Sequence, residues 1–260
     1  MKAFKQAVLL GVAGAAVWLA MVLGAGFANR SLVNLWDSDI TLRLVRAEQL
    51  HDGRRFDDHI LRRVFPPEGI SLHWTAPMDA LLVSGAALFS RERGYRAALE
   101  EWSKWLPGLL AAAALFFIGL TLAELGRAPQ TGFWALGIFF LMPAMLCEFA
   151  PGNADHHGLQ AVLWLALTLF VVQCFSRSCL KRPFVLAGVA AGLGLWVSVQ
   201  FLVPIVLALC ALGVRWFYAD WRDRRNFALM PAALAAVLAA AIMVEYPWSA
   251  LLTPAYDMVS

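Results

Sequence analysis

Long apolar runs constrain this chain more than any other feature of its sequence. A helix that crosses a bilayer needs about 20 apolar residues, and runs of that length recur along most of the 260 residues. Hydrophobic residues make up 61% of the chain and charged residues only 15%, which is more apolar surface than a soluble core of this size can bury. The sequence therefore predicts an all-α integral membrane protein. Its small net charge of +3 gives no indication of nucleic-acid binding.

About seven membrane spans are expected from the lengths of these runs. The stretch 183–217 is apolar for 35 residues, too long for one span, so we expect it to fold back near Ser198 and Gln200, with Pro204 starting the return. The expected spans are 6–28, 105–126, 132–150, 158–175, two short spans within 183–217, and 227–244.

The first run has two possible interpretations. Lys2 and Lys5 precede an apolar run from 7 to 28, so the segment could be a cleaved signal peptide or a retained span. The apolar region of a signal peptide usually has about 7–15 residues. The greater length here favours a retained first span.

Basic residues predict the orientation. If the N-terminus is cytoplasmic, the external connections at 151–157, 198–201 and 245–260 carry neither Lys nor Arg. Cytoplasmic connections are enriched in these residues, whereas external loops longer than about 60 residues escape the rule. The basic residues placed inside are Lys2, Lys5, Arg127, Arg177, Lys181, Arg182, Arg215, Arg222, Arg224 and Arg225.

Three regions follow from this topology. Residues 1–28 form the first span, 29–104 a large external loop, and 105–260 the remaining transmembrane bundle. The external loop is polar and helix-like. Its apolar segment from Pro77 to Ser90 is too short to cross the bilayer and is expected to lie at the membrane surface.

The external loop opens with an acidic motif, Trp36-Asp37-Ser38-Asp39. A helix that begins near Asp39 places Asp39, Arg43 and Arg46 on one face, at spacings i, i+4 and i+7. One carboxylate and two guanidiniums suit a metal-bound phosphate. Alternatively, one of the acidic motif's side chains caps the helix and the arginines pair with lipid phosphates. On this stretch alone, capping is the better interpretation.

A second polar motif, 153–157, precedes the span 158–175 and reads NADHH. Asn153 or Asp155 can cap the helix, but capping does not explain His156 and His157. The positive end of a helix dipole favours the neutral imidazole, which is the form that binds metals. A carboxylate with imidazoles suits zinc, iron or manganese, whereas magnesium prefers oxygen ligands.

Three adjacent residues do not complete a coordination sphere, so the second motif needs a distant partner. The external carboxylates on rigid elements that could meet it are those at the top of the first span. His73 and Trp74 in the loop could line the same pocket, although Trp74 also suits an anchor at the membrane surface.

The order of these motifs resembles the membrane glycosyltransferases of the GT-C superfamily, especially the catalytic subunits of oligosaccharyltransferases. RLVRAEQLHDGRRFDD and FPPEGISLHWTAPMD are similar to a loop that those subunits carry, and GNADHHGLQ to the second motif of their archaeal members. The resemblance covers most of residues 30–165. Those subunits continue through more spans into a soluble domain, so we expect this chain to be either a fragment or a shorter relative with a different acceptor.

The resemblance implies a GT-C-like fold and specific residue roles. Asp39 would be a metal ligand and the catalytic base, Asp37 the outer acidic residue of the first motif, and Asp155 and His157 further metal ligands. The cofactor would be a divalent metal, Mn²⁺ or Mg²⁺. The side chains expected to bind the donor phosphate are Arg43, Arg46, His156, His73 and Trp74.

The expected function is metal-assisted, inverting transfer of a sugar or oligosaccharide from a polyprenyl-phosphate donor to a glycan, lipid or protein acceptor. It would take place on the periplasmic side of a bacterial inner membrane, where the protein also contacts membrane lipid. Two other classes stay open: a transporter or flippase, and a metal-dependent membrane hydrolase.

Overall fold

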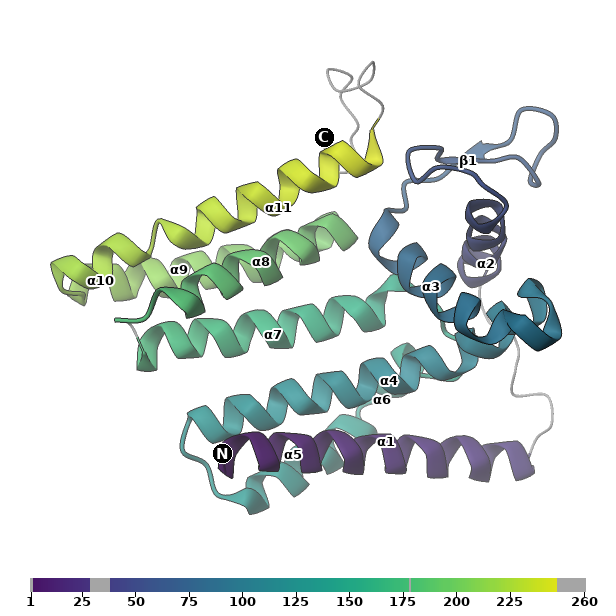
Figure 1. Cartoon of the computed structure of the whole chain (residues 1–260). Helices are drawn as coiled ribbons and strands as arrows, with labels where there is room; N and C mark the ends of the chain where they lie inside the picture. Colours follow the sequence, from purple (N-terminus) through teal and green to yellow (C-terminus); the bar gives the residue numbers. More distant parts are fainter. Residues whose placement is uncertain (1, 29–37, 178, 247–260) are drawn as a thin grey trace.

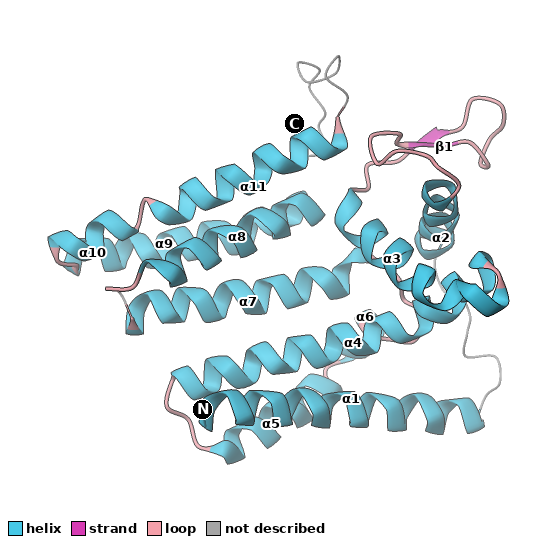
Figure 2. Ribbon diagram, in the orientation of Figure 1, coloured by secondary structure: helices cyan, strands magenta, loops and turns pink. Residues whose placement is uncertain are grey.

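The computed structural model describes residues 2–28, 38–177 and 179–246 of the chain (Figures 1 and 2). Its elements in chain order are α1 (Lys2–Ala28), α2 (Ser38–His51), β1 (Ile60–Leu61), β2 (Ile70–Ser71), α3 (Ala76–Arg93), α4 (Tyr95–Glu124), α5 (Pro129–Leu141), α6 (Pro143–Glu148), α7 (His156–Ser176), α8 (Lys181–Val197), the 3₁₀ turn η1 (Val199–Phe201), α9 (Leu202–Tyr218), α10 (Trp221–Asn226) and α11 (Leu229–Glu245).

The helices form an all-α bundle suited to a membrane. Within the described residues, five segments are long and apolar enough to cross a bilayer: Phe4–Leu23, Tyr95–Glu124, His156–Ser176, Val199–Tyr218 and Arg224–Glu245. They correspond to five of the expected spans. The shorter α8 has 17 residues, or about 26 Å of helix.

The expected span over 132–150 is not one continuous helix. The segment forms two helices, α5 with 13 residues and α6 with 6, which are separated at Met142. Pro143 has no backbone N–H, and a proline disfavours helical geometry at the residue before it. Met142 accordingly adopts φ −77° and ψ 117°, an extended conformation. Neither α5 nor α6 alone is long enough to cross the bilayer.

Small residues allow the helices to pack closely. A Cβ atom on Gly119 of α4 would lie 2.8 Å from the Cα atom of Ala7 in α1, and one on Gly188 of α8 would lie 2.2 Å from the carbonyl oxygen of Met230 in α11. Without a hydrophobic driving force between helices in lipid, such close approach supplies van der Waals contact. The α1–α4 and α8–α11 pairs therefore depend on glycine.

The predicted return within 183–217 is present. Ser198 ends α8 in an extended conformation with φ −163° and ψ 141°, and η1 leads into α9. Pro204 lies in the first turn of α9, where its missing N–H removes no helical hydrogen bond. The ribbon view shows that α7, α8, α9 and α11 lie side by side (Figure 1).

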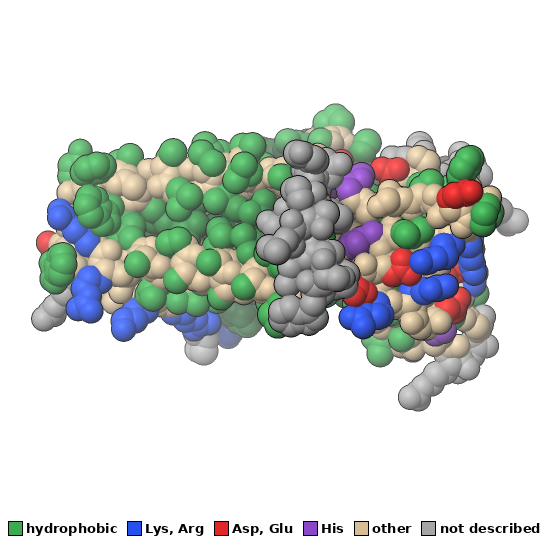
Figure 3. Space-filling view, turned by 90° about the horizontal axis from the view of Figure 1, so that it is seen from above, with side chains coloured by type: hydrophobic (Ala, Val, Ile, Leu, Met, Phe, Trp, Pro, Cys, Tyr) green, Lys and Arg blue, Asp and Glu red, His purple; other side chains and the backbone are tan. Residues whose placement is uncertain are grey.

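The region between α1 and α4 gathers at one end of the bundle. There α2 lies beside α3, and the two-stranded antiparallel hairpin β1–β2 pairs Ile60 with Ser71 and Leu61 with Ile70. Leu61, Leu72 and Trp74 form a small buried cluster of their own. The apolar segment expected at the membrane surface is α3, which buries Met78 and Leu82 in the core that it shares with α2 and α4. Side chains of mixed charge gather at this end, whereas Lys and Arg dominate the far end, near α10 (Figure 3).

Candidate metal and substrate site

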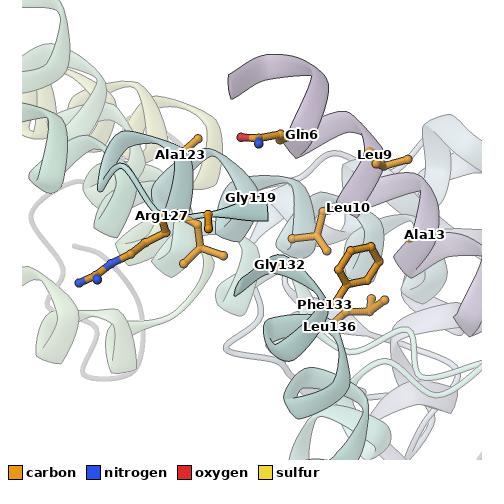
Figure 4. A pocket seen from close by; sticks show the side chains of 12 residues that line it. Gln6, Leu9, Leu10, Ala13, Gly119, Ala123, Arg127, Gly132, Phe133 and Leu136 are labelled. Atoms are coloured by element: carbon orange, nitrogen blue, oxygen red, sulfur yellow. The ribbon is translucent and has the colours of Figure 1, made fainter. Parts of the chain in front are cut away.

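A cavity of about 430 Å³ lies at one end of the bundle, where α2, the start of α7 and the α8–α9 turn meet. It brings the two acidic motifs together although they are far apart in the sequence. Its lining consists of Asp39, Arg43, His73, Trp74, Thr75, Asp155, His156, His157, Leu195, Trp196, Val197, Ser198, Val199 and Gln200. A second, mostly apolar cavity of about 70 Å³ between α1, α4 and α5 includes Gln6 and Arg127 but no carboxylate or imidazole (Figure 4).

Asp155 caps α7. Its backbone is extended, with φ −84° and ψ 163°, and its Oδ1 atom accepts a hydrogen bond of 2.7 Å from the backbone N–H of His156. Asn153 supports the cap, because its side-chain oxygen accepts the N–H of Asp155 at 3.3 Å. The capping interpretation is therefore confirmed, and it uses one oxygen of this carboxylate.

The same carboxylate lies against both imidazoles. Oδ1 of Asp155 is 2.6 Å from Nδ1 of His156, and Oδ2 is 3.5 Å from Nε2 of His157. Among the described residues, these three form the group of possible metal ligands, with ligand atoms within 4.8 Å of one another. Ligand atoms bonded to one ion at about 2.1 Å lie within about 4.2 Å of each other. The three side chains are therefore a candidate ligand set for a divalent ion.

The charge of Asp155 is maintained by its surroundings. Burial raises the pKa of this carboxyl, but the hydrogen bond and charge of His156 and the guanidinium of Arg43 outweigh burial and hold the pKa well below its usual range. Nη2 of Arg43 lies 3.5 Å from Oδ1 of Asp155. The carboxyl group of Asp155 is therefore ionised at neutral pH.

Asp39 lies in the first turn of α2 and lines the cavity with an exposed side chain. Ser38 donates a hydrogen bond of 3.5 Å to its Oδ1 atom. Asp39 is not a member of the ligand group above, whose third residue is His156, so the ligand set Asp39, Asp155 and His157 stays a prediction. Asp37 lies outside the described residues.

Arg43 and Arg46 share a face of α2 with Asp39, as expected, but both are buried. Asp79 of α3, itself fully buried, binds Nη1 of Arg43 at 3.1 Å and Nε of Arg46 at 2.6 Å. Arg43 extends past Asp79 to the cavity. Arg46 instead contacts Nδ1 of His59 at 3.3 Å and does not line the cavity, a position that does not suit the expected role in phosphate binding.

His73 and Trp74 both line the cavity, as the sequence suggested. Trp74 is buried, and its ring lies 4.5 Å from the guanidinium carbon of Arg43, a cation–π arrangement. This burial does not fit the alternative of an anchor at the membrane surface.

Glu245, at the end of α11, ties the region between α1 and α4 to the bundle. Its Oε1 atom accepts the backbone N–H of Ala76 at 2.7 Å and the indole N–H of Trp196 at 2.5 Å. His59 donates from Nε2 to the backbone oxygen of Glu245 at 3.1 Å, while Nδ1 faces Arg46. These contacts fix the walls of the cavity from behind.

Sequence reasoning missed Asp79, Trp196 and Glu245. A signal was present for the two acids, because each stands in or at the end of an apolar run, where an ionisable residue is a suspect for function. Trp196 carries no comparable signal among the 11 tryptophans of the chain. Comparison with models of protein families, with curated proteins and with solved structures finds no match.

Proposed function

We propose that the chain is an integral-membrane glycosyltransferase that moves a sugar from a polyprenyl-phosphate donor to an acceptor outside the membrane. One observation carries this proposal: Asp39 of the first motif and Asp155 and His157 of the second line a single cavity at the end of apolar helices. The lipid of such a donor would stay in the bilayer while its phosphate reached the cavity. The acceptor is a glycan, a lipid or a protein.

Charge in the cavity supports a bound cation. The cavity is lined by two carboxyl groups, those of Asp39 and Asp155, and by the single guanidinium of Arg43, which is also shared with Asp79. An anionic phosphate would be repelled unless positive charge were added. Asp155 and His157, joined by Asp39 or His156, would hold a divalent ion. Two imidazoles suit Mn²⁺ better than Mg²⁺.

The reaction follows from the positions of these groups. A bound divalent ion would act as a Lewis acid and stabilise the negative charge of the leaving phosphate. Asp39 would orient the acceptor and take the proton from its nucleophilic atom. As the new bond to the anomeric carbon forms, the bond to the phosphate oxygen breaks and its electron pair stays on the phosphate. Direct displacement inverts the anomeric centre. Asp37 would act beside Asp39.

The distribution of basic residues supports a periplasmic site in a bacterial inner membrane. Arg127, Arg177 and Lys181 belong to the connections opposite the cavity, which the positive-inside rule places in the cytoplasm. We retain the inference of about seven spans, with α8 and the interrupted segment α5–α6 crossing together with the five long segments.

A transfer assay with matched variants tests the proposal. The full chain in lipid nanodiscs receives Mn²⁺, radiolabelled polyprenyl-phosphate sugars and a panel of glycan, lipid and peptide acceptors. We expect Asp39→Ala and Asp155→Ala to slow transfer at least about 100-fold. Asp52→Ala, which removes an exposed carboxylate just beyond α2, serves as the control. Wild-type transfer rates in both cavity variants would refute the proposal.

The same assay separates two other classes. A metal-dependent hydrolase is favoured by the two imidazoles beside Asp155, and it would release free sugar from the donor without labelling any acceptor. A transporter usually binds its substrate near the middle of the membrane between broken helices. The cavity is lined instead by α2, the start of α7 and the α8–α9 turn, which lie at one end of the long helices (Figure 1), and this position argues against transport.

A further inference from the structure

The cavity has a second wall of different chemistry. The wall formed by α2 and α7 carries the charged groups, whereas the α8–α9 turn, residues 195–200, contributes uncharged side chains. The uncharged wall offers no electrostatic attraction to an anionic phosphate. A ligand that fills the cavity therefore needs an uncharged part as well as an anionic part.

The uncharged wall is built as a fixed surface. Thr75 donates a hydrogen bond of 3.2 Å to the backbone oxygen of Val197, which anchors the turn to the region between α1 and α4. Phe201 is buried against Gly194, where a Cβ atom would come within 2.3 Å of its ring. The hydroxyl of Ser198 accepts the backbone N–H of Gln200 at 3.4 Å. The turn thus keeps a defined shape.

Trp196 is the centre of this wall. Its indole N–H is bound to Oε1 of Glu245 at 2.5 Å, so the polar edge of the ring has a partner behind the wall. Trp196 is half-buried and lines the cavity. Trp74, the other tryptophan of the lining, is covered by the guanidinium of Arg43 at 4.5 Å. Trp196 therefore offers a fixed apolar surface with polar side chains, Ser198 and Gln200, close by in the sequence.

We propose that residues 196–200 form a subsite for an uncharged sugar ring, with Trp196 as the stacking surface. A pyranose has an apolar face of C–H groups and a rim of hydroxyl groups. The first matches the indole ring, and the second matches the amide of Gln200 and the hydroxyl of Ser198. The cavity, at about 430 Å³, has the size of a small-molecule site rather than a phosphate site.

The choice of a sugar as the ligand rests on the proposed function. The subsite also assigns an orientation to the sugar phosphate in the cavity. The phosphate would face Arg43 and the α7 motif, and the sugar would face the α8–α9 turn. The anomeric carbon would then lie between the two walls. The subsite adds a requirement that the proposed reaction alone does not make: the sugar must contribute to binding in the absence of any acceptor.

Binding measurements on the full chain in nanodiscs test the subsite separately from transfer. The probes are farnesyl phosphate and its glucose, galactose, mannose and N-acetylglucosamine derivatives, with Mn²⁺ present. We expect at least one sugar to strengthen binding about tenfold over farnesyl phosphate. Trp196→Ala should abolish this gain while leaving the affinity for farnesyl phosphate unchanged. Gln200→Ala should reduce the gain about threefold.

Two further variants keep the test decisive. Trp196→Phe retains an aromatic ring and should keep part of the gain even if the alanine variant folds poorly. Trp134→Ala removes a tryptophan that is 75% exposed on α5 and should change nothing. The subsite is refuted if all four sugars bind no better than farnesyl phosphate, or if Trp196→Ala keeps the full gain. A gain that depends on Trp196 in a chain without transfer activity would support the subsite and count against the proposed reaction.

Discussion

Replacing Asp79 with asparagine removes the charge that the buried guanidiniums of Arg43 and Arg46 share. Asp79 is fully buried, and the two arginines are 1% and 3% exposed, so water does not replace the lost carboxylate. Breaking a buried ion pair by removing one partner costs about 3–5 kcal/mol. Asparagine still accepts a hydrogen bond, and Arg43 keeps Asp155 at 3.5 Å. We therefore expect Asp79→Asn to lower the free energy of unfolding by about 3 kcal/mol.

Unfolding by SDS in mixed micelles, followed by tryptophan fluorescence, measures this loss. The control is Glu100→Gln, which breaks a pair with Arg96 in which the side chains are 48% and 54% exposed, and it should cost no more than about 0.5 kcal/mol. A triple variant, Asp79→Leu with Arg43→Met and Arg46→Met, should be more stable than Asp79→Asn, because no buried charge is left unpaired. If Asp79→Asn cost no more than Glu100→Gln, the role given to Asp79 would be wrong.

Three further predictions concern other parts of the molecule. Burial and the charge of Arg46 lower the pKa of His59 from its ordinary value of 6.5, so below that pH the unfolded chain binds a proton that the folded chain resists. The free energy of unfolding should fall as the pH drops below about 6.5, and His59→Gln should flatten this decline in SDS titrations at several pH values. Gly119→Val should destabilise the chain by about 1–3 kcal/mol because its Cβ meets the backbone of Ala7, whereas Gly137→Val, with open space around it, should not. In calorimetric titration with Mn²⁺, Asp155→Asn should weaken binding at least about tenfold, and His51→Gln, outside the cavity, should leave it unchanged.

Apolar run length and turn chemistry made most of the helices predictable. The run that begins after the second motif became α7, and the reversal at Ser198 followed from a run too long for one span. The failure at 132–150 has a local cause: hydropathy does not register that Pro143 disfavours helical geometry at Met142. Composition alone therefore overestimates the length of a span with an internal proline.

The meeting of the two motifs was predictable from topology, whereas their exact pairing was not. Asp39 and Asp155 were expected at the same membrane face, and they line one cavity. Helical spacing placed Arg43 and Arg46 on one face of α2 but could not show that Asp79 of α3 binds both. Contacts such as those of Glu245 with Ala76 and Trp196 join residues far apart in the sequence, and no local pattern encodes them.

We propose that this cavity carries out metal-assisted transfer of a sugar. The most direct measurement is the rate of acceptor labelling by the wild-type chain in nanodiscs before chelation, after chelation with EDTA, and after addition of Mn²⁺. We predict that chelation abolishes labelling and that Mn²⁺ restores it with inversion at the anomeric carbon. An unchanged rate after chelation, or the release of free sugar alone, would contradict the account.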